Sequence, residues 1–97
     1  MNINQLLCST ELAVSGLLTD KVLAVAVGWD EARLCLTLRY YFSDEPTGEE
    51  KEMCSCALAE LEAEFSPYIE NAKDEWICSA KKLDELDPLS GWGYVKR

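Results

Sequence analysis

The sequence contains no histidine among its 97 residues. Histidine is the commonest general base and a common metal ligand, so its absence removes any Ser–His or Cys–His nucleophile pair. No glycine-rich loop leads into a helix, as a phosphate-binding site would require; Gly91 and Gly93 only flank Trp92 near the end of the chain. These absences disfavour catalysis, and we expect a protein that is not an enzyme and has no cofactor.

Long apolar runs are also missing. No stretch approaches the roughly 20 apolar residues that a membrane span needs. The first residues carry no basic region ahead of their leucines, and Glu11 interrupts the apolar run that follows. These features predict that no signal peptide is present, that the protein does not bind membranes and that it is cytoplasmic.

Cysteine is present five times, an odd number, at Cys8, Cys35, Cys54, Cys56 and Cys78. Without a secretion signal, this count predicts reduced thiols in place of a disulfide framework. Cys54 and Cys56 would point about 200° apart on a helix, and a structural zinc site normally needs four ligands in paired spacings. We therefore expect no metal site, with Cys54 and Cys78 as small core residues and Cys56 partly exposed.

Positive charge is scarce, because 18 acidic residues face 9 lysines and arginines, for a net charge of −9. The imbalance is local: the segment from Ser43 to Glu75 holds eleven acidic residues and only two lysines, and the rest of the chain is neutral. A surface of the same sign as phosphate disfavours direct nucleic-acid binding. It favours a basic protein partner.

The first half of the chain shows one helical and two strand-like patterns. Residues 3–18 place apolar side chains at helical spacing, and Asn2 or Asn4 is a suitable cap. Residues 22–29 are apolar on both faces, which is typical of a central strand. Residues 33–42 alternate strictly between apolar and other side chains, which predicts a second strand and, with the first, a β-hairpin.

The second half is predicted to start with a helix. Thr47 and Glu50 form a capping-box pattern, and the helix runs to about Phe65. Strands follow at residues 74–81 and 92–96. The fold class is therefore α+β, in one domain spanning residues 1–97, in the order helix-strand-strand-helix-strand-strand, with the helices on one face of a small antiparallel sheet. The predicted core includes Leu34, Leu36, Leu38, Leu58, Leu61 and Phe65.

Aromatic and acidic side chains are the candidates for partner contact. Tyr41 falls on the strand face opposite the leucines, and Trp92 lies between two glycines, so both are candidates for exposed anchors rimmed by carboxylates. The predicted partner-binding residues are Tyr41, Asp44, Glu45, Glu49, Glu52, Glu62 and Trp92. Second choices are Asp84, Glu85 and Asp87. The alternative is that these carboxylates only solvate an exposed helix.

Four segments carry a family resemblance, namely Ser15–Leu18, Val27–Asp30, Leu36–Phe42 and Glu45–Glu50. In this order the chain resembles small immunity proteins encoded beside bacterial polymorphic toxins, including those of contact-dependent growth inhibition systems. The resemblance implies a protein that binds and neutralises a cognate toxin domain, often a nuclease. With the acidic segment, it favours a basic toxin as partner, bound by a monomer or weak dimer. An acidic adaptor or regulatory subunit of another cytoplasmic complex is the alternative.

Overall fold

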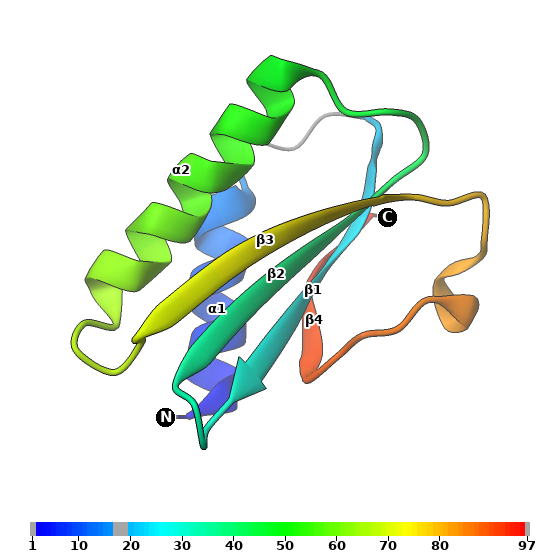
Figure 1. Ribbon diagram of the computed structural model, residues 1–97. Helices are drawn as coiled ribbons and strands as arrows, with labels where there is room; N and C mark the ends of the chain where they lie inside the picture. The colour runs from blue at the N-terminus through cyan, green and yellow to red at the C-terminus, as the bar shows by residue number, and fades with distance from the viewer. Residues whose placement is uncertain (1, 17–19, 97) are drawn as a thin grey trace.

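In the computed structural model, the described residues, 2–16 and 20–96, form two α-helices and one four-stranded sheet. The helices cover one face of the sheet, whose strand order is β3-β2-β1-β4 (Figure 1). The elements are α1 (Ile3–Val14), β1 (Val22–Asp30), β2 (Cys35–Phe42), α2 (Gly48–Glu64), β3 (Asn71–Cys78), the short 3₁₀ helix η1 (Leu83–Glu85) and β4 (Gly91–Val95).

The start of α1 confirms the predicted cap. The Asn2 side-chain oxygen accepts the backbone N–H of Asn4 at 2.9 Å, which satisfies a donor that has no partner within the helix. The buried residues, Leu6, Thr10 and Val14, follow one another at intervals of four and so share one face. The helix ends at Val14, with Ser15 as its C-cap, so it stops before the predicted end; Leu17 and Leu18 of the prediction lie outside the described residues.

The β1–β2 hairpin is antiparallel, as predicted, and β1 is a central strand. The alternating residues of β2 that face the helices are buried, namely Leu36, Leu38, Tyr40 and Phe42. Leu34 was wrongly placed with them: it has a φ of 52°, precedes the strand and is only half-buried in the turn. Leu34 belongs to the turn between the two strands, in which the Asp30 side chain accepts the N–H of Ala32 at 3.1 Å.

The capping box of α2 is present as predicted. Thr47 accepts the N–H of Glu50 at 3.1 Å, and the Glu50 carboxylate accepts the N–H of Thr47 at 2.9 Å. The predicted core residues Cys54, Leu58, Leu61 and Phe65 are confirmed, since all four are buried. With the buried Ala57 they form the inner stripe of α2 and its C-cap.

The sheet is mixed, so the predicted antiparallel sheet is wrong in one strand pair. β3 pairs with β2 in parallel, from Cys35 opposite Asn71 to Phe42 opposite Cys78. The physical reason is the length of α2, which carries the chain back to the start of β2, so that β3 must run in the same direction. β3 also begins three residues before the predicted Asp74. β4 pairs antiparallel with β1.

The second face of the sheet is covered by a mostly irregular segment, which holds η1 but no α-helix. The segment between β3 and β4, residues 79–90, packs on it through Leu86 and Leu89, and the Ser90 N–H donates to the Val27 carbonyl at 2.8 Å. This cluster is much smaller than the core under the helices, which joins residues from α1, α2, β1 and β2. In the part of the chain that the structure describes, neither helix is long and apolar enough to cross a membrane.

Candidate partner-binding surface

Four of the predicted acidic residues lie together at the N-terminal end of α2. Asp44 and Glu45 belong to the loop that enters the helix, and Glu49 and Glu52 belong to its first turns; all four are exposed. We call these four residues the acidic end. The Asp44 side chain accepts the Glu45 N–H at 2.8 Å, and the capping box holds the helix start, so the carboxylates stand on ordered backbone.

Glu50 caps α2 and forms an ion pair, so we do not count its charge with that of the acidic end. Its carboxylate lies 2.6 Å from Nζ of Lys21, and the side chain is only 12% exposed. Lys21 also donates to the Glu45 carbonyl at 3.0 Å, so this lysine ties the β1 start to the acidic loop. Within residues 2–16 and 20–96, no lysine or arginine forms an ion pair with a carboxylate of the acidic end.

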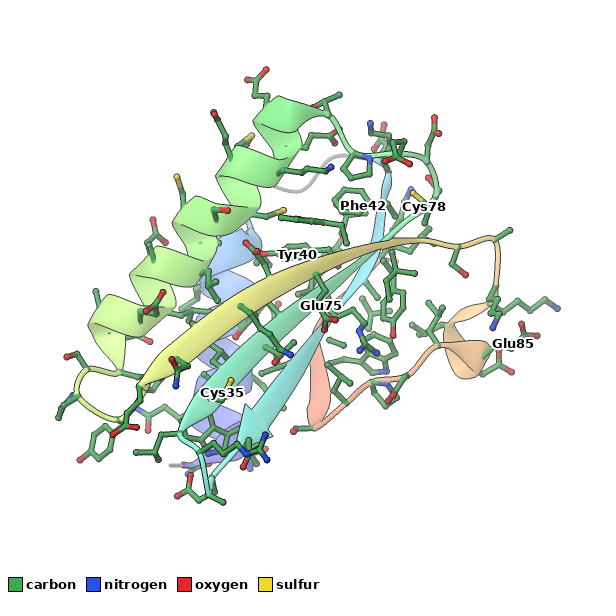
Figure 2. The ribbon with its side chains drawn as sticks, viewed as in Figure 1. Cys35, Tyr40, Phe42, Glu75, Cys78 and Glu85 are labelled. Atoms are coloured by element: carbon green, nitrogen blue, oxygen red, sulfur yellow. The ribbon has the colours of Figure 1, made fainter. Side chains whose placement is uncertain are left out.

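The thiol of Cys78 lies beside the acidic end. Cys78 ends β3 and lies beside the loop (Figure 2), with its Sγ 3.7 Å from a carboxylate oxygen of Glu45. Desolvation raises the pKa of Cys78, and the charges of Glu45 and Asp44 raise it further. Cys78 is exposed, so its predicted place in the core is wrong: the strand ends there, beyond the reach of α2. Cys54 is buried and Cys56 is exposed, as expected.

Glu62 is exposed but is separated from the acidic end. It follows Glu52 by ten residues, which is about 15 Å along a helix that rises 1.5 Å per residue. The structure therefore does not bring Glu62 together with the other four carboxylates.

Tyr41 is not the exposed anchor that the sequence pattern predicted. It does face away from the leucines, but only 3% of its surface is exposed, because the 79–90 segment covers it. Its hydroxyl donates to the Asp87 carbonyl at 2.8 Å, and its ring meets that of Trp92 edge-on at 5.9 Å. Trp92 is half-buried on the same face. Both aromatics thus lie on the face of the sheet opposite the helices, where the 79–90 segment packs.

The second choices for partner contact, Asp84, Glu85 and Asp87, lie on the 79–90 segment itself. Asp84 and Glu85 belong to η1, and all three, Asp87 included, are exposed. The Asp87 carboxylate lies 3.9 Å from Arg39, whose guanidinium also lies 3.4 Å from Glu75. Asp87 therefore helps to hold the segment on the sheet.

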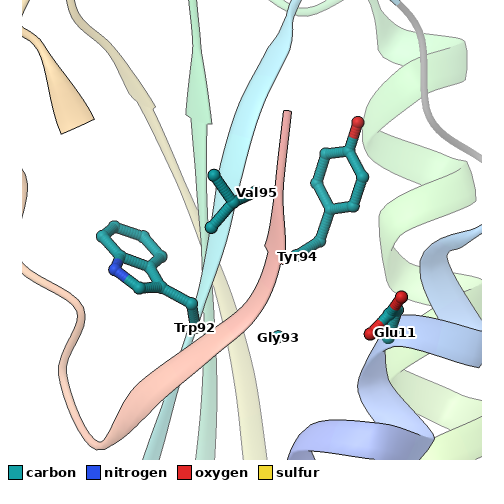
Figure 3. Close-up of a pocket in the computed structure, with 5 residues that line it drawn as sticks. All are labelled: Glu11, Trp92, Gly93, Tyr94 and Val95. Atoms are coloured by element: carbon teal, nitrogen blue, oxygen red, sulfur yellow. The ribbon is translucent and has the colours of Figure 1, made fainter. Parts of the chain in front are cut away.

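A groove along β4 was not found by sequence reasoning. It has a volume of about 550 Å³ and is lined by Glu11 of α1 and by four consecutive residues, 92–95 (Figure 3). No sequence signal marks it, because a groove at a sheet edge depends on which strand is left without a neighbour.

The described residues form a small α+β protein with an ordered acidic end and an open sheet edge at β4. Comparison with protein families identifies the class of protein. The model of the MafI2 immunity protein family matches residues 3–97, and the chain belongs to this family. It is therefore an immunity protein, as the resemblance had implied, and immunity proteins generally act without catalysis. The comparison with curated proteins finds no match.

Proposed function

We propose that this immunity protein neutralises a basic cognate toxin domain, most simply a nuclease, by binding it directly through the acidic end. Family membership supplies the immunity role. The observation that carries the mechanism is the grouping of Asp44, Glu45, Glu49 and Glu52 on ordered backbone. No lysine or arginine of the described residues forms an ion pair with these four.

The electrostatic argument concerns both the rate and the site of binding. A nuclease holds phosphates in a basic cleft, and a cluster of like-charged carboxylates attracts such a cleft during diffusional encounter. The N-terminal end of a helix carries partial positive charge, which the acids of the first turn offset. Glu45 and Asp44 of this end lie close enough to Cys78 that their charges add to desolvation, the larger cause, in raising the pKa of its thiol.

The immunity role is tested with the toxin domain encoded by the neighbouring gene. Co-expression with this chain should restore growth of cells that the toxin alone arrests. Purified toxin should degrade nucleic acid, and an equimolar amount of this protein should stop the degradation. A toxin that binds but degrades no nucleic acid would remove the nuclease assignment and leave the immunity role.

The contact surface is tested by reversing the charges of Asp44, Glu45 and Glu49 to lysine together. Association should slow and lose most of its dependence on salt, because steering acts through the summed field. The matched control reverses three other exposed acids and gives the same change in net charge. Glu60 and Glu64 belong to the second half of α2, and Glu70 lies just before β3. Circular dichroism checks that both variants fold. Equal association rates for the two triple variants would show that the acidic end is not the contact surface.

A further inference from the structure

The two edge strands of the sheet differ in their protection. An edge strand presents unpaired backbone N–H and C=O groups, and charged side chains usually prevent other strands from adding to it. β3 carries three consecutive charged residues, 73–75, and Asp74 also accepts the hydroxyl of Ser55 from α2 at 3.1 Å. β4 carries no charged residue between Gly91 and Val95. Within Gly91–Val95, β4 thus lacks the charged side chains that protect β3.

The groove along β4 lies at its free edge. Trp92 and Tyr94 point to opposite sides of the strand, and both line the groove together with Gly93 and Val95 (Figure 3). A hollow lined from both sides of one strand runs along that strand's edge. α1 closes one side, because it packs so closely that a Cβ on Gly93 would lie 2.7 Å from Thr10 Cγ2.

The backbone at the end of β4 has a donor that faces this groove. The Lys96 N–H donates to the Leu23 carbonyl at 2.9 Å, so it points toward β1. Because backbone direction alternates along a strand, the N–H of Val95 points away from β1 and toward the open edge. An added strand would find this donor unoccupied by the sheet.

The charge beside the groove indicates which strand would fit. Glu11 is the one charged side chain among the lining residues, it is exposed, and within the described part of the chain it has no ion pair. A second copy of this chain would bring another Glu11 and another net charge of −9 to the same edge, which opposes self-pairing. A strand with a lysine or arginine opposite Glu11 has the complementary charge.

The groove also adjoins the acidic end. The Lys96 amino group donates to the Asp20 carbonyl at 2.7 Å, and the next residue, Lys21, holds Glu50 and the Glu45 carbonyl. The end of β4 and the acidic loop are thus joined through two residues, so one partner can contact both.

We propose that the free edge of β4 receives an extended basic segment of the cognate toxin, which adds to the sheet as a fifth strand beside β4. This proposal rests on the proposed function, because the toxin is the occupant. Main-chain hydrogen bonds supply the binding, and Glu11 selects a basic residue in the added strand.

Hydrogen exchange of the complex with the neighbouring-gene toxin domain is the first test. The Val95 amide should exchange quickly in the free protein and at least about tenfold more slowly in the complex, since strand pairing closes the edge. If the toxin binds while this amide stays unprotected, that result would overturn the added strand and leave the proposed function intact. A toxin that does not bind at all would overturn both.

Two variants of Val95 separate the contribution of its backbone N–H to toxin binding from that of its side chain. Val95→Pro removes the outward N–H without removing a bond to β1, which an edge strand tolerates, whereas Val95→Ala keeps the N–H and trims the side chain. The proline variant should bind the toxin domain about five- to a hundredfold more weakly than the alanine variant, because a carbonyl of the added strand loses its partner. Equal affinities of the two folded variants would contradict the proposal.

The basic residue is tested by Glu11→Lys against Glu60→Lys, which changes the net charge equally on the other helix. Glu11→Lys should weaken binding more than its control does. Sedimentation of the free protein tests the other occupant: a dimer in which the Val95 amide is protected would show that the edge belongs to a second copy and would overturn the proposal. Equal effects of Glu11→Lys and Glu60→Lys on binding would show that Glu11 does not select a basic strand.

Discussion

The two faces of the sheet are covered in different ways. One face carries α1 and α2 and a continuous core in which Leu36, Leu38 and Leu61 are at most 1% exposed. The other face carries the 79–90 segment, which packs through Leu86 and Leu89 and is fixed by hydrogen bonds to Tyr41 and Val27. Regular helices bury long stripes, whereas this segment buries only a few side chains and relies on specific polar contacts.

If the proposed function holds, the difference separates stability from recognition. The helix-covered core supplies most of the apolar burial, which is the main favourable term in folding. The acidic end and the β4 groove both lie where regular cover stops, at a helix start and at a sheet edge. Groups at such places keep unpaired charges and unpaired backbone donors, and these are the groups that a partner can use.

The largest expected effect is on the helix-covered face. Leu36→Ala should lower the free energy of unfolding by about 2–5 kcal/mol, because Leu36 is fully buried and its removal leaves a cavity. Urea denaturation followed by circular dichroism measures the change. A loss below about 1 kcal/mol would mean that this core is not tightly packed.

The second face should respond less to the same kind of truncation. Leu86→Ala should cost about 1–2 kcal/mol, since Leu86 retains 8% exposure and the irregular segment can settle into the space left behind. Leu83→Ala on the same segment is the control: Leu83 is 40% exposed, and the change should stay within about 0.5 kcal/mol. If Leu86→Ala cost as much as Leu36→Ala, the two faces would be equally important for stability.

The polar contact on the second face should contribute less again. Tyr41→Phe removes the hydroxyl that donates to Asp87 and keeps the ring against Trp92, so it should cost about 0.5–1.5 kcal/mol. Tyr68→Phe, at a residue that is 62% exposed, provides the comparison and should leave the denaturation midpoint unchanged. Faster hydrogen exchange in residues 79–90 of the Tyr41→Phe variant would show that this bond holds the segment in place.

The smallest expected effect is on the reactivity of Cys78, where the chain leaves β3 to cross to the second face. A raised pKa means less thiolate at pH 8, so Cys78 should react slowly with iodoacetamide despite its exposure. Glu45→Gln removes a negative charge, lowers the pKa of Cys78 and should speed its alkylation roughly two- to fivefold. Peptide mass spectrometry measures each cysteine separately, with Cys8 and Cys56 as exposed controls. An unchanged rate at Cys78 would show that Glu45 does not act on this thiol.

Local chemistry made several elements predictable from the sequence. Asn2 and Thr47 mark their helix starts because each side chain binds N–H groups within its own first turn. The alternation from Leu36 to Phe42 follows from strand geometry and one buried face, and the inner stripe of α2 follows from helical spacing. The acidic end was also predictable, because Asp44 to Glu52 are close in sequence.

Contacts between distant residues decided the rest. The direction of β3 depends on where α2 returns the chain, and period-two alternation is the same for parallel and antiparallel strands. Tyr41 faces away from the leucines as its position requires, but its burial depends on a segment more than 35 residues further along the chain. The sequence by itself determined the helix caps, the hairpin and the charge asymmetry, because these depend on neighbours along the chain. Only the tertiary structure decided which face is covered by what and which strand keeps a free edge, because these depend on neighbours in space.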